Sequence, residues 1–323
     1  MTRALAVVAA VALALAMSCR IPDEHLRVGD GGGASDDAGM DAMGDGPPPA
    51  CNLAGPWGHL NPVEGLVPMR SVARFSPDET TAYFALGSDG TATTEPDTLY
   101  VATKPVMGTF GLPTKLTGVN GSDGESTPAI SSNGTLLYYV WGEPPVHMTG
   151  SDRDLYVATR SGSAAQFGSG TKLGGGINAV GAEDDYVSVA ANGDLWFSSQ
   201  RGSDPTLSIY MAPSVGNGQF GTVQRADALN ATTVGDYYPT VAPDQLTIYF
   251  LRSNLVFVAT RSSPTDDFGN VTTLDDLDNA DCMDTVDVDC RPAWVSPDGC
   301  RFYVGTGSSG GTITMYYSSK PAN

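Results

Sequence analysis

Short apolar runs rich in aromatic and β-branched residues alternate with polar turns along most of the chain. One turn phrase, Phe75-Ser76-Pro77-Asp78 in its first copy, occurs five times. The later copies are residues 130–134, 189–193, 241–244 and 295–299, and the steps between their Asp or Asn positions are 55, 59, 52 and 54 residues. Pro-Asp-Gly and Asn-Gly reverse the chain tightly, and the runs beside them suit half-buried strands. Each copy therefore predicts an antiparallel hairpin.

Three further phrases recur after the turns at similar spacing, two of them after all five turns and the third after four. An apolar strand occurs at residues 83–84, 137–139, 195–199, 248–250 and 302–304. A strand of the Leu-Tyr-Val-Ala-Thr type occurs at 99–103, 155–160, 208–212, 256–261 and 315–318, and a Phe-Gly element at 110–116, 167–173, 220–226 and 268–274. Four strands at a period of about 50 residues are typical of a propeller blade. We predict an all-β domain over residues 51–323, a β-propeller of five four-stranded antiparallel blades, with six blades as the alternative.

The fifth copy ends after its third strand, at Lys320. The missing Phe-Gly element has a counterpart ahead of the first copy, where Trp57-Gly58 leads to Leu66. We expect this N-terminal strand to complete the last blade, because doing so removes an exposed sheet edge and closes the ring.

The Ser-Pro-Asp-Gly turn, the Leu-Tyr-Val-Ala-Thr-Arg strand and the Phe-Gly element together resemble the WD-repeat-like propeller family that includes TolB. The resemblance covers about residues 55–320. It implies the propeller fold and, for function, protein partners in the periplasm.

The N-terminus reads as an export signal. Arg3 precedes an apolar run over residues 5–17, which is too short for an ordinary membrane-spanning helix. Ser18-Cys19 after that run resembles the bacterial lipobox, which implies cleavage of residues 1–18 and lipid attachment to Cys19. An ordinary secretory signal is the alternative, since Ala16 stands where the lipobox prefers Leu. Arg20 favours the outer membrane over the inner one.

Residues 19–50 are rich in Gly, Pro and Asp and poor in apolar side chains. Such a segment buries too little apolar surface to offset the entropy of ordering, so we expect a disordered tether that holds the domain off the membrane. The lipid would be the only attachment to the membrane.

The chain carries 36 acidic and 17 basic residues, a net charge of −19. So negative a surface repels phosphate backbones, and we expect no nucleic-acid partner. Solubility accounts for the charge, and attraction of cations or basic partners is the alternative. We expect a monomer.

Four cysteines remain after the anchor: Cys51, Cys282, Cys290 and Cys300. An even number in an exported chain suggests two disulfides. We favour the pairing of Cys282 with Cys290 and of Cys51 with Cys300. The first bridge would be local, and the second would join the closing strand to its blade. Two other pairings remain open. The spacing does not suit zinc.

Acidic residues recur in register before the turns. Glu125, Asp184 and Asp236 lie eight residues ahead of the turn Asp or Asn, Asp289 is offset by one residue, and Arg70 occupies the position in the first copy. If the innermost strand starts there, these acids ring one mouth of the channel and suit a cation or a basic ligand. The alternative, which repetition in every blade favours, is that they hydrogen-bond within or between blades. Arg160, Arg201 and Arg261 would then be their partners.

Catalytic signatures are sparse. The three histidines, His25, His59 and His147, do not cluster, and no nucleophile elbow, metalloprotease helix or phosphate-binding loop occurs. The acidic stretch from Asp275 to Asp289 lacks EF-hand spacing, so a solvated loop is favoured over calcium binding. We expect no cofactor and no metal. The tryptophans are expected in blade cores, or beside a channel mouth where one would stack on a sugar.

Two functions fit the sequence. The first is a non-enzymatic envelope lipoprotein whose propeller binds or scaffolds a protein or cell-wall glycan. The second is a secreted hydrolase or lyase acting on glycans. Fold cannot decide between them, because function depends on sites carried by the fold.

Overall fold

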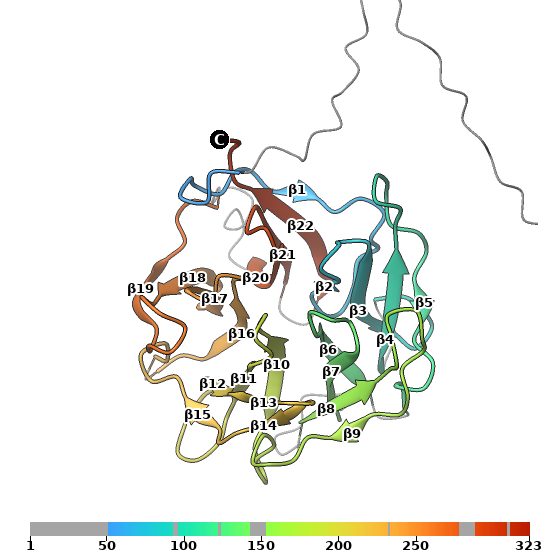
Figure 1. The fold of residues 1–323 in the computed structure, drawn as a ribbon. Helices are drawn as coiled ribbons and strands as arrows, with labels where there is room; N and C mark the ends of the chain where they lie inside the picture. The colour runs from blue at the N-terminus through green and yellow to red at the C-terminus, as the bar shows by residue number, and fades with distance from the viewer. Residues whose placement is uncertain are drawn as a thin grey trace, which may run out of the picture. The chain divides into compact units, whose positions relative to one another are not determined.

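The structure is a computed structural model, and it describes residues 51–92, 96–121, 124–142, 153–231, 233–277, 288–308 and 311–323. All regular structure in these residues is β, in five four-stranded antiparallel sheets and one small two-stranded hairpin. The sheets are arranged in a ring around a common centre (Figure 1), and the region that their innermost strands enclose is called the channel below. The prediction of a five-bladed propeller is confirmed.

In each of the first four blades the strands follow one another in sequence from the channel outwards. The first blade contains β2 (Arg74–Phe75), β3 (Thr81–Gly87), β4 (Asp97–Thr103) and β5 (Thr114–Lys115), and the second contains β6 (Glu125–Ile130), β7 (Leu136–Trp141), β8 (Asp154–Thr159) and β9 (Thr171–Lys172). The third contains β10 (Asp184–Val189), β11 (Leu195–Ser199), β12 (Ser208–Ala212) and β15 (Gln224–Arg225), with the hairpin β13 (Ser214–Gly216) and β14 (Gln219–Phe220) attached to it. The fourth contains β16 (Asp236–Val241), β17 (Thr247–Arg252), β18 (Leu255–Thr260) and β19 (Gly269–Thr273).

The fifth blade is built from both ends of the domain. Its inner strands are β20 (Val288–Val295), β21 (Arg301–Ser308) and β22 (Thr314–Ser319), and its outer strand is β1 (Asn61–Pro62), which pairs with β22. A disulfide between Cys51 and Cys300 lies at the same seam. The closing strand and this bridge are arranged as the sequence predicted.

The recurrent turns explain the hairpins that begin each blade. In the first blade the Ser76 hydroxyl accepts a hydrogen bond from the Thr81 amide at 3.0 Å and donates to the Asp78 carboxylate at 2.5 Å. The fifth blade repeats this arrangement, where the Arg301 amide donates to the Ser296 hydroxyl at 2.9 Å. Ser and Asp side chains thus satisfy backbone groups that a two-strand reversal leaves without partners.

The buried apolar side chains form clusters between neighbouring blades rather than within one. Tyr83 and Leu99 of the first blade pack with Leu137 of the second, and Trp196 of the third packs with Phe250 of the fourth. Each blade therefore hides its apolar face only against the next, which is why the sheets close into a ring. Trp57 is 5% exposed and packs on Phe302, so the segment that leads into the closing strand supplies the aromatic that the Phe-Gly element supplies elsewhere.

Several predicted features lie outside the described residues. They are the signal peptide over 1–18, Cys19, the tether over 19–50, His25, His147, Cys282 and residues 278–287 of the acidic stretch. In the part of the chain that is described, no helix has the length and apolar character needed to cross a membrane.

Candidate functional site

The innermost strands β2, β6, β10, β16 and β20 surround the channel (Figure 1). Register shifts in four of them mark β-bulges, for example between Asp185 and Ser188 in β10. Thr127, Tyr186 and Tyr238 take positive φ angles of 41°, 51° and 54° at these bulges. A bulge re-aims side chains, and here it separates the two ends of each inner strand. We call them the acidic end, defined by Glu125, Asp184, Asp236 and Asp289, and the pocket end.

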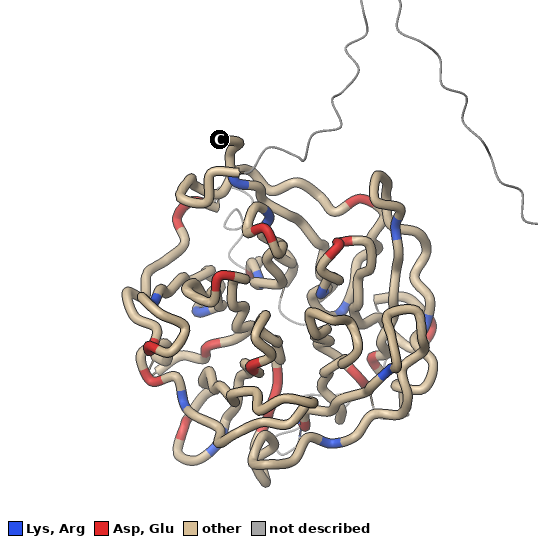
Figure 2. Tube along the Cα trace, viewed as in Figure 1, with Lys and Arg blue, Asp and Glu red and all other residues tan. Residues whose placement is uncertain are grey.

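The four acids of the acidic end lie at the first or second residue of β6, β10, β16 and β20. Glu125, Asp184, Asp236 and Asp289 are 1%, 0%, 0% and 8% exposed. Two of them form matching ion pairs, Asp184 with Arg201 and Asp236 with Arg252, both at 2.6 Å. Each of these two carboxylates also accepts a backbone N–H at 2.8 Å, from Ala179 and from Ala231. Figure 2 shows acidic positions on the strands around the channel as well as on the outer loops.

In the other three blades the residue at this position is partnered differently. Asp289 accepts two hydrogen bonds from Arg291, at 3.0 and 3.2 Å, and Glu125 accepts the Gly121 amide. In the first blade the charges are reversed, because Arg70 occupies the acid position and pairs with Asp97 of β4. The acids are thus part of the structural framework of their blades.

Burial raises the pKa of Asp184 and of Asp236, and hydrogen bonds from Arg201 and Arg252 oppose that shift. A carboxylate held this way has little capacity left for an added cation. Among the described residues, no group of three or more His, Cys, Asp or Glu side chains is arranged to hold a metal ion. The geometry favours the structural interpretation of these acids over a cation-binding crown.

The arginines are used differently from the prediction. Only Arg201 of the three pairs with one of the acids. Arg160 and Arg261 lie instead over the rings of Phe167 and Phe268, at 4.4 and 4.2 Å. Each donates a hydrogen bond to a carbonyl in a turn, Arg160 to that of Gly134 and Arg261 to that of Gln245. Their position after the third strand places them at the turn side of the blade, remote in register from the acids.

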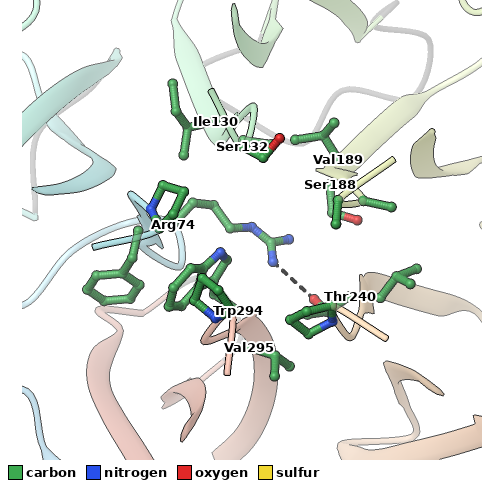
Figure 3. A pocket seen from close by; sticks show the side chains of 16 residues that line it. Arg74, Ile130, Ser132, Ser188, Val189, Thr240, Trp294 and Val295 are labelled. Atoms are coloured by element: carbon green, nitrogen blue, oxygen red, sulfur yellow. Dashed lines mark hydrogen bonds between the residues drawn. The ribbon is translucent and has the colours of Figure 1, made fainter. Parts of the chain in front are cut away.

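The pocket end holds a cavity of about 190 Å³ that receives side chains from all five blades (Figure 3). The same three repeat positions line it in each blade. The position nearest the bulge contributes Arg74, Ala129, Ser188, Thr240 and Trp294. The next contributes Phe75, Ile130, Val189, Val241 and Val295, and the turn contributes Pro77, Ser132, Ala191, Pro243 and Pro297. The walls are therefore largely apolar.

Arg74 is the charged residue among those that line this cavity, and it is 4% exposed. Its guanidinium donates to the Thr240 hydroxyl at 3.0 Å and to the Val187 carbonyl at 3.4 Å. Burial lowers the pKa of Arg74 to about 9, an effect that the nearby Tyr238 partly opposes. In Figure 3 the guanidinium points into the space between Thr240 and Ser188.

Two further side chains give the pocket its character. The Ser188 hydroxyl is buried and has no hydrogen-bond partner among the described residues. Trp294 presents its indole beside Arg74 (Figure 3), and it is the tryptophan that lies at a channel mouth. No carboxylate, histidine or cysteine is among the lining residues, so within the described part of the chain Ser132 and Ser188 have no base beside them in this cavity. The arrangement suits binding.

The sequence contained a signal for this site that the repeat phrases did not expose. Four residues before each turn Asp or Asn stand Arg74, Ala129, Ser188, Thr240 and Trp294. Three copies carry a small residue and two carry a large one, so this position breaks the repeat symmetry. Comparison of single positions across the copies, rather than of phrases, identifies Arg74 and Trp294.

The cysteines fit the pairing that we favoured as far as they are described. Cys51 and Cys300 form one bridge. Cys290 is also disulfide-bonded, and its partner lies outside the described residues. The predicted partner, Cys282, is among those residues.

No protein-family model matches the chain, and no curated protein is similar to it in sequence. Solved structures do match it in fold. A putative exo-β-1,3-galactanase from Bifidobacterium bifidum has a TM-score of 0.51 at 11% identity, over 83% of this chain and 94% of that one. TolB from Acinetobacter baumannii has a TM-score of 0.42 at 17% identity, over 78% of this chain and 55% of that one. The periplasmic gluconolactonase of Pseudomonas aeruginosa has a TM-score of 0.44 at 13% identity, over 76% of this chain and 70% of that one.

The likeness is one of fold. TolB-like propellers are among the neighbours, as the sequence resemblance suggested, and this chain spans about half the length of that TolB, 55%. Likeness of fold does not choose a function, because function depends on the site that the fold carries.

Proposed function

We propose that the protein is a non-enzymatic binding module that recognises its ligand or partner at the pocket end of the channel. The observation that supports this is the composition of the cavity, which all five blades line and in which the described residues place no acid–base pair beside the serines. Concave, largely apolar sites with a few converging polar groups are typical of ligand recognition. The acidic end offers less, because three of its four carboxylates, those of Asp184, Asp236 and Asp289, are engaged in ion pairs.

The proposal places this module in the bacterial envelope. Its support is the N-terminal sequence, with the signal over residues 1–18, the lipobox-like Ser18-Cys19 and the polar stretch over 19–50. A lipid on Cys19 would attach the chain to a membrane, where envelope proteins and glycans are available as partners.

Obstructing the pocket tests this function. Ala191 is exposed at the rim, so Ala191→Trp covers the cavity without disturbing the core. Leu112→Trp is the matched control, since Leu112 is 89% exposed on the outer loop between β4 and β5. We expect the full chain and Leu112→Trp to capture the same envelope component by affinity purification, and Ala191→Trp to lose it.

A panel of glycans and esters completes the test. We expect no turnover by the full chain. Turnover that Ala191→Trp abolishes and Leu112→Trp retains would contradict the proposal and favour a hydrolase or lyase. Equal capture by both tryptophan variants would contradict it as well, because binding would then lie elsewhere.

A further inference from the structure

Arg74 is a buried cation without a buried anion. Among the described residues no carboxylate lies within ion-pair distance of its guanidinium. A carboxylate does pair with each of four arginines at the acidic end, Arg70, Arg201, Arg252 and Arg291. A guanidinium carries five N–H donors, and two of them are used, on Thr240 and Val187. Burying a charge is costly unless it is paired and hydrogen-bonded. The free donors and the unmatched charge therefore both call for an anionic acceptor.

A second buried group points to the same place. The Ser188 hydroxyl has no partner in the described part of the chain and lines the cavity together with Arg74. It comes from β10, whereas Arg74 comes from β2 and Thr240 from β16. Figure 3 shows the three side chains directed toward one another around a common space. Orphaned buried hydroxyls are uncommon, and a ligand oxygen is the partner this one lacks.

The rest of the cavity selects the body of the ligand. Beside the polar groups of Arg74, Ser188 and Thr240, the cavity is lined by apolar side chains. They are those of Phe75, Ile130, Val189, Val241, Val295 and Trp294. Walls of this kind exclude a highly hydrated ligand and favour an apolar group next to the charge. One arginine also limits the charge, since a phosphate at neutral pH carries nearly two negative charges and the chain as a whole has a net charge of −19. A singly charged anion fits best.

We propose that the pocket binds a carboxylate that terminates an apolar group, with Arg74 and Ser188 donating hydrogen bonds to it. Arginine suits this role because its planar fork matches the two carboxylate oxygens. The apolar group would lie against Trp294 and the ring of aliphatic side chains. This inference deepens the proposed function and rests on it. Two sources share the chemistry: a small free acid, and the carboxyl end of a peptide chain.

Calorimetric titration of the full chain with 3-phenylpropionate tests the inference. We expect binding by the wild type, at least tenfold weaker binding by Arg74→Met, and about threefold weaker binding by Ser188→Ala. Neutral 3-phenylpropionamide should bind at least tenfold more weakly than the acid. Arg225→Met is the control for loss of one positive charge, because Arg225 lies on the outer strand β15, and it should bind like the wild type.

A peptide pair identifies the source. The first probe is an N-acetylated tripeptide ending in Phe with a free carboxylate, and the second is the same peptide amidated. Binding of the free-acid peptide more tightly than 3-phenylpropionate assigns the site to a chain end. Binding of 3-phenylpropionate alone assigns it to a small acid. Either result supports a carboxylate site if Arg74→Met removes it.

Three outcomes overturn the inference: equal binding of acid and amide, equal binding by wild type and Arg74→Met, and no binding of any of these probes. Circular dichroism and thermal melting confirm that the variants are folded. None of these outcomes decides the proposed function, which depends on whether Ala191→Trp loses the envelope component. A wrong ligand class is thereby distinguished from a wrong binding surface.

Discussion

The two ends of the channel use buried arginine in opposite ways. At the acidic end Arg201 and Arg252 each face a fully buried aspartate, and charge is neutralised within the blade. At the pocket end Arg74 is 4% exposed and meets a hydroxyl and a carbonyl instead. A buried ion pair adds little net stability, yet losing one partner is costly. A buried arginine without a carboxylate partner lowers the stability of the fold, but it leaves in the cavity a charged group that can bind an anion.

The largest expected effect concerns the disulfide that ties the pocket end of the fifth blade. Cys300 follows the turn whose Pro297 lines the cavity, and its bond to Cys51 spans a sequence separation of 249. In the chain-entropy model a loop of this length contributes about 5 kcal/mol. We expect Cys51→Ser/Cys300→Ser to lose about that much in urea unfolding, and to show faster hydrogen exchange at the pocket end than at the acidic end. An equal increase in hydrogen exchange at both ends would contradict the idea that the disulfide mainly stabilises the pocket end.

A comparable loss is expected when the acidic end is left with an unmatched charge. Arg252→Met removes the partner of Asp236, which is 0% exposed. Breaking a buried pair in this way costs about 3–5 kcal/mol. Urea unfolding at pH 7 measures the loss. Arg252→Met/Asp236→Leu should recover most of it, and failure of the double variant to do so would mean that the pair does more than neutralise charge.

Removing the arginine of the pocket end should have the opposite sign. Arg74→Met leaves no buried carboxylate behind and replaces a costly buried charge with an apolar chain of similar length. We expect the free energy of unfolding without ligand to rise by about 1–2 kcal/mol, measured in the same urea experiment. A loss of more than about 1 kcal/mol would show that the hydrogen bonds to Thr240 and Val187 outweigh the cost of burying the charge.

The fold was predictable because its information is local and repeated. Turn formers such as Pro77-Asp78 recur with strands of fixed length beside them, and the unfinished fifth copy indicates its own closing strand. The acids were found for the same reason, since they recur in register. Their interpretation was harder, because Asp236 could be matched to Arg252 only once the second strand lay against the first.

Arg74 could not be interpreted from its neighbours in sequence. Its two hydrogen-bond partners are 166 and 113 residues away, in the fourth and third blades. Its lack of a counter-charge depends on what the other inner strands place across the channel, and no local pattern reports that. Arg160 and Arg261 illustrate the reverse error: their recurrence was visible, but their contacts with Phe167 and Phe268 depend on how the outer strands stack.

The smallest expected effect is a pH dependence of the difference between Arg74→Met and the wild type. Burial lowers the pKa of Arg74 to about 9, so between pH 9 and the ordinary arginine range the unfolded state binds more protons than the folded state. Stability therefore rises with pH through this group in the wild type, and the variant has no such contribution.

Tyr238, the titratable group beside Arg74, does not interfere, because burial raises its pKa to about 12. The free energy of unfolding of Arg74→Met should thus exceed that of the wild type by a constant amount from pH 6 to 8. This difference should narrow by up to about 1 kcal/mol by pH 10. Urea unfolding of both proteins at pH 6, 8, 9 and 10 gives the difference directly. The pKa of Arg225 is instead raised by its acidic neighbours, so the offset between Arg225→Met and the wild type should not change over this range. A constant offset for Arg74→Met as well would mean that its guanidinium holds its proton as firmly as one in water, and the comparison between the two channel ends would lose its electrostatic basis.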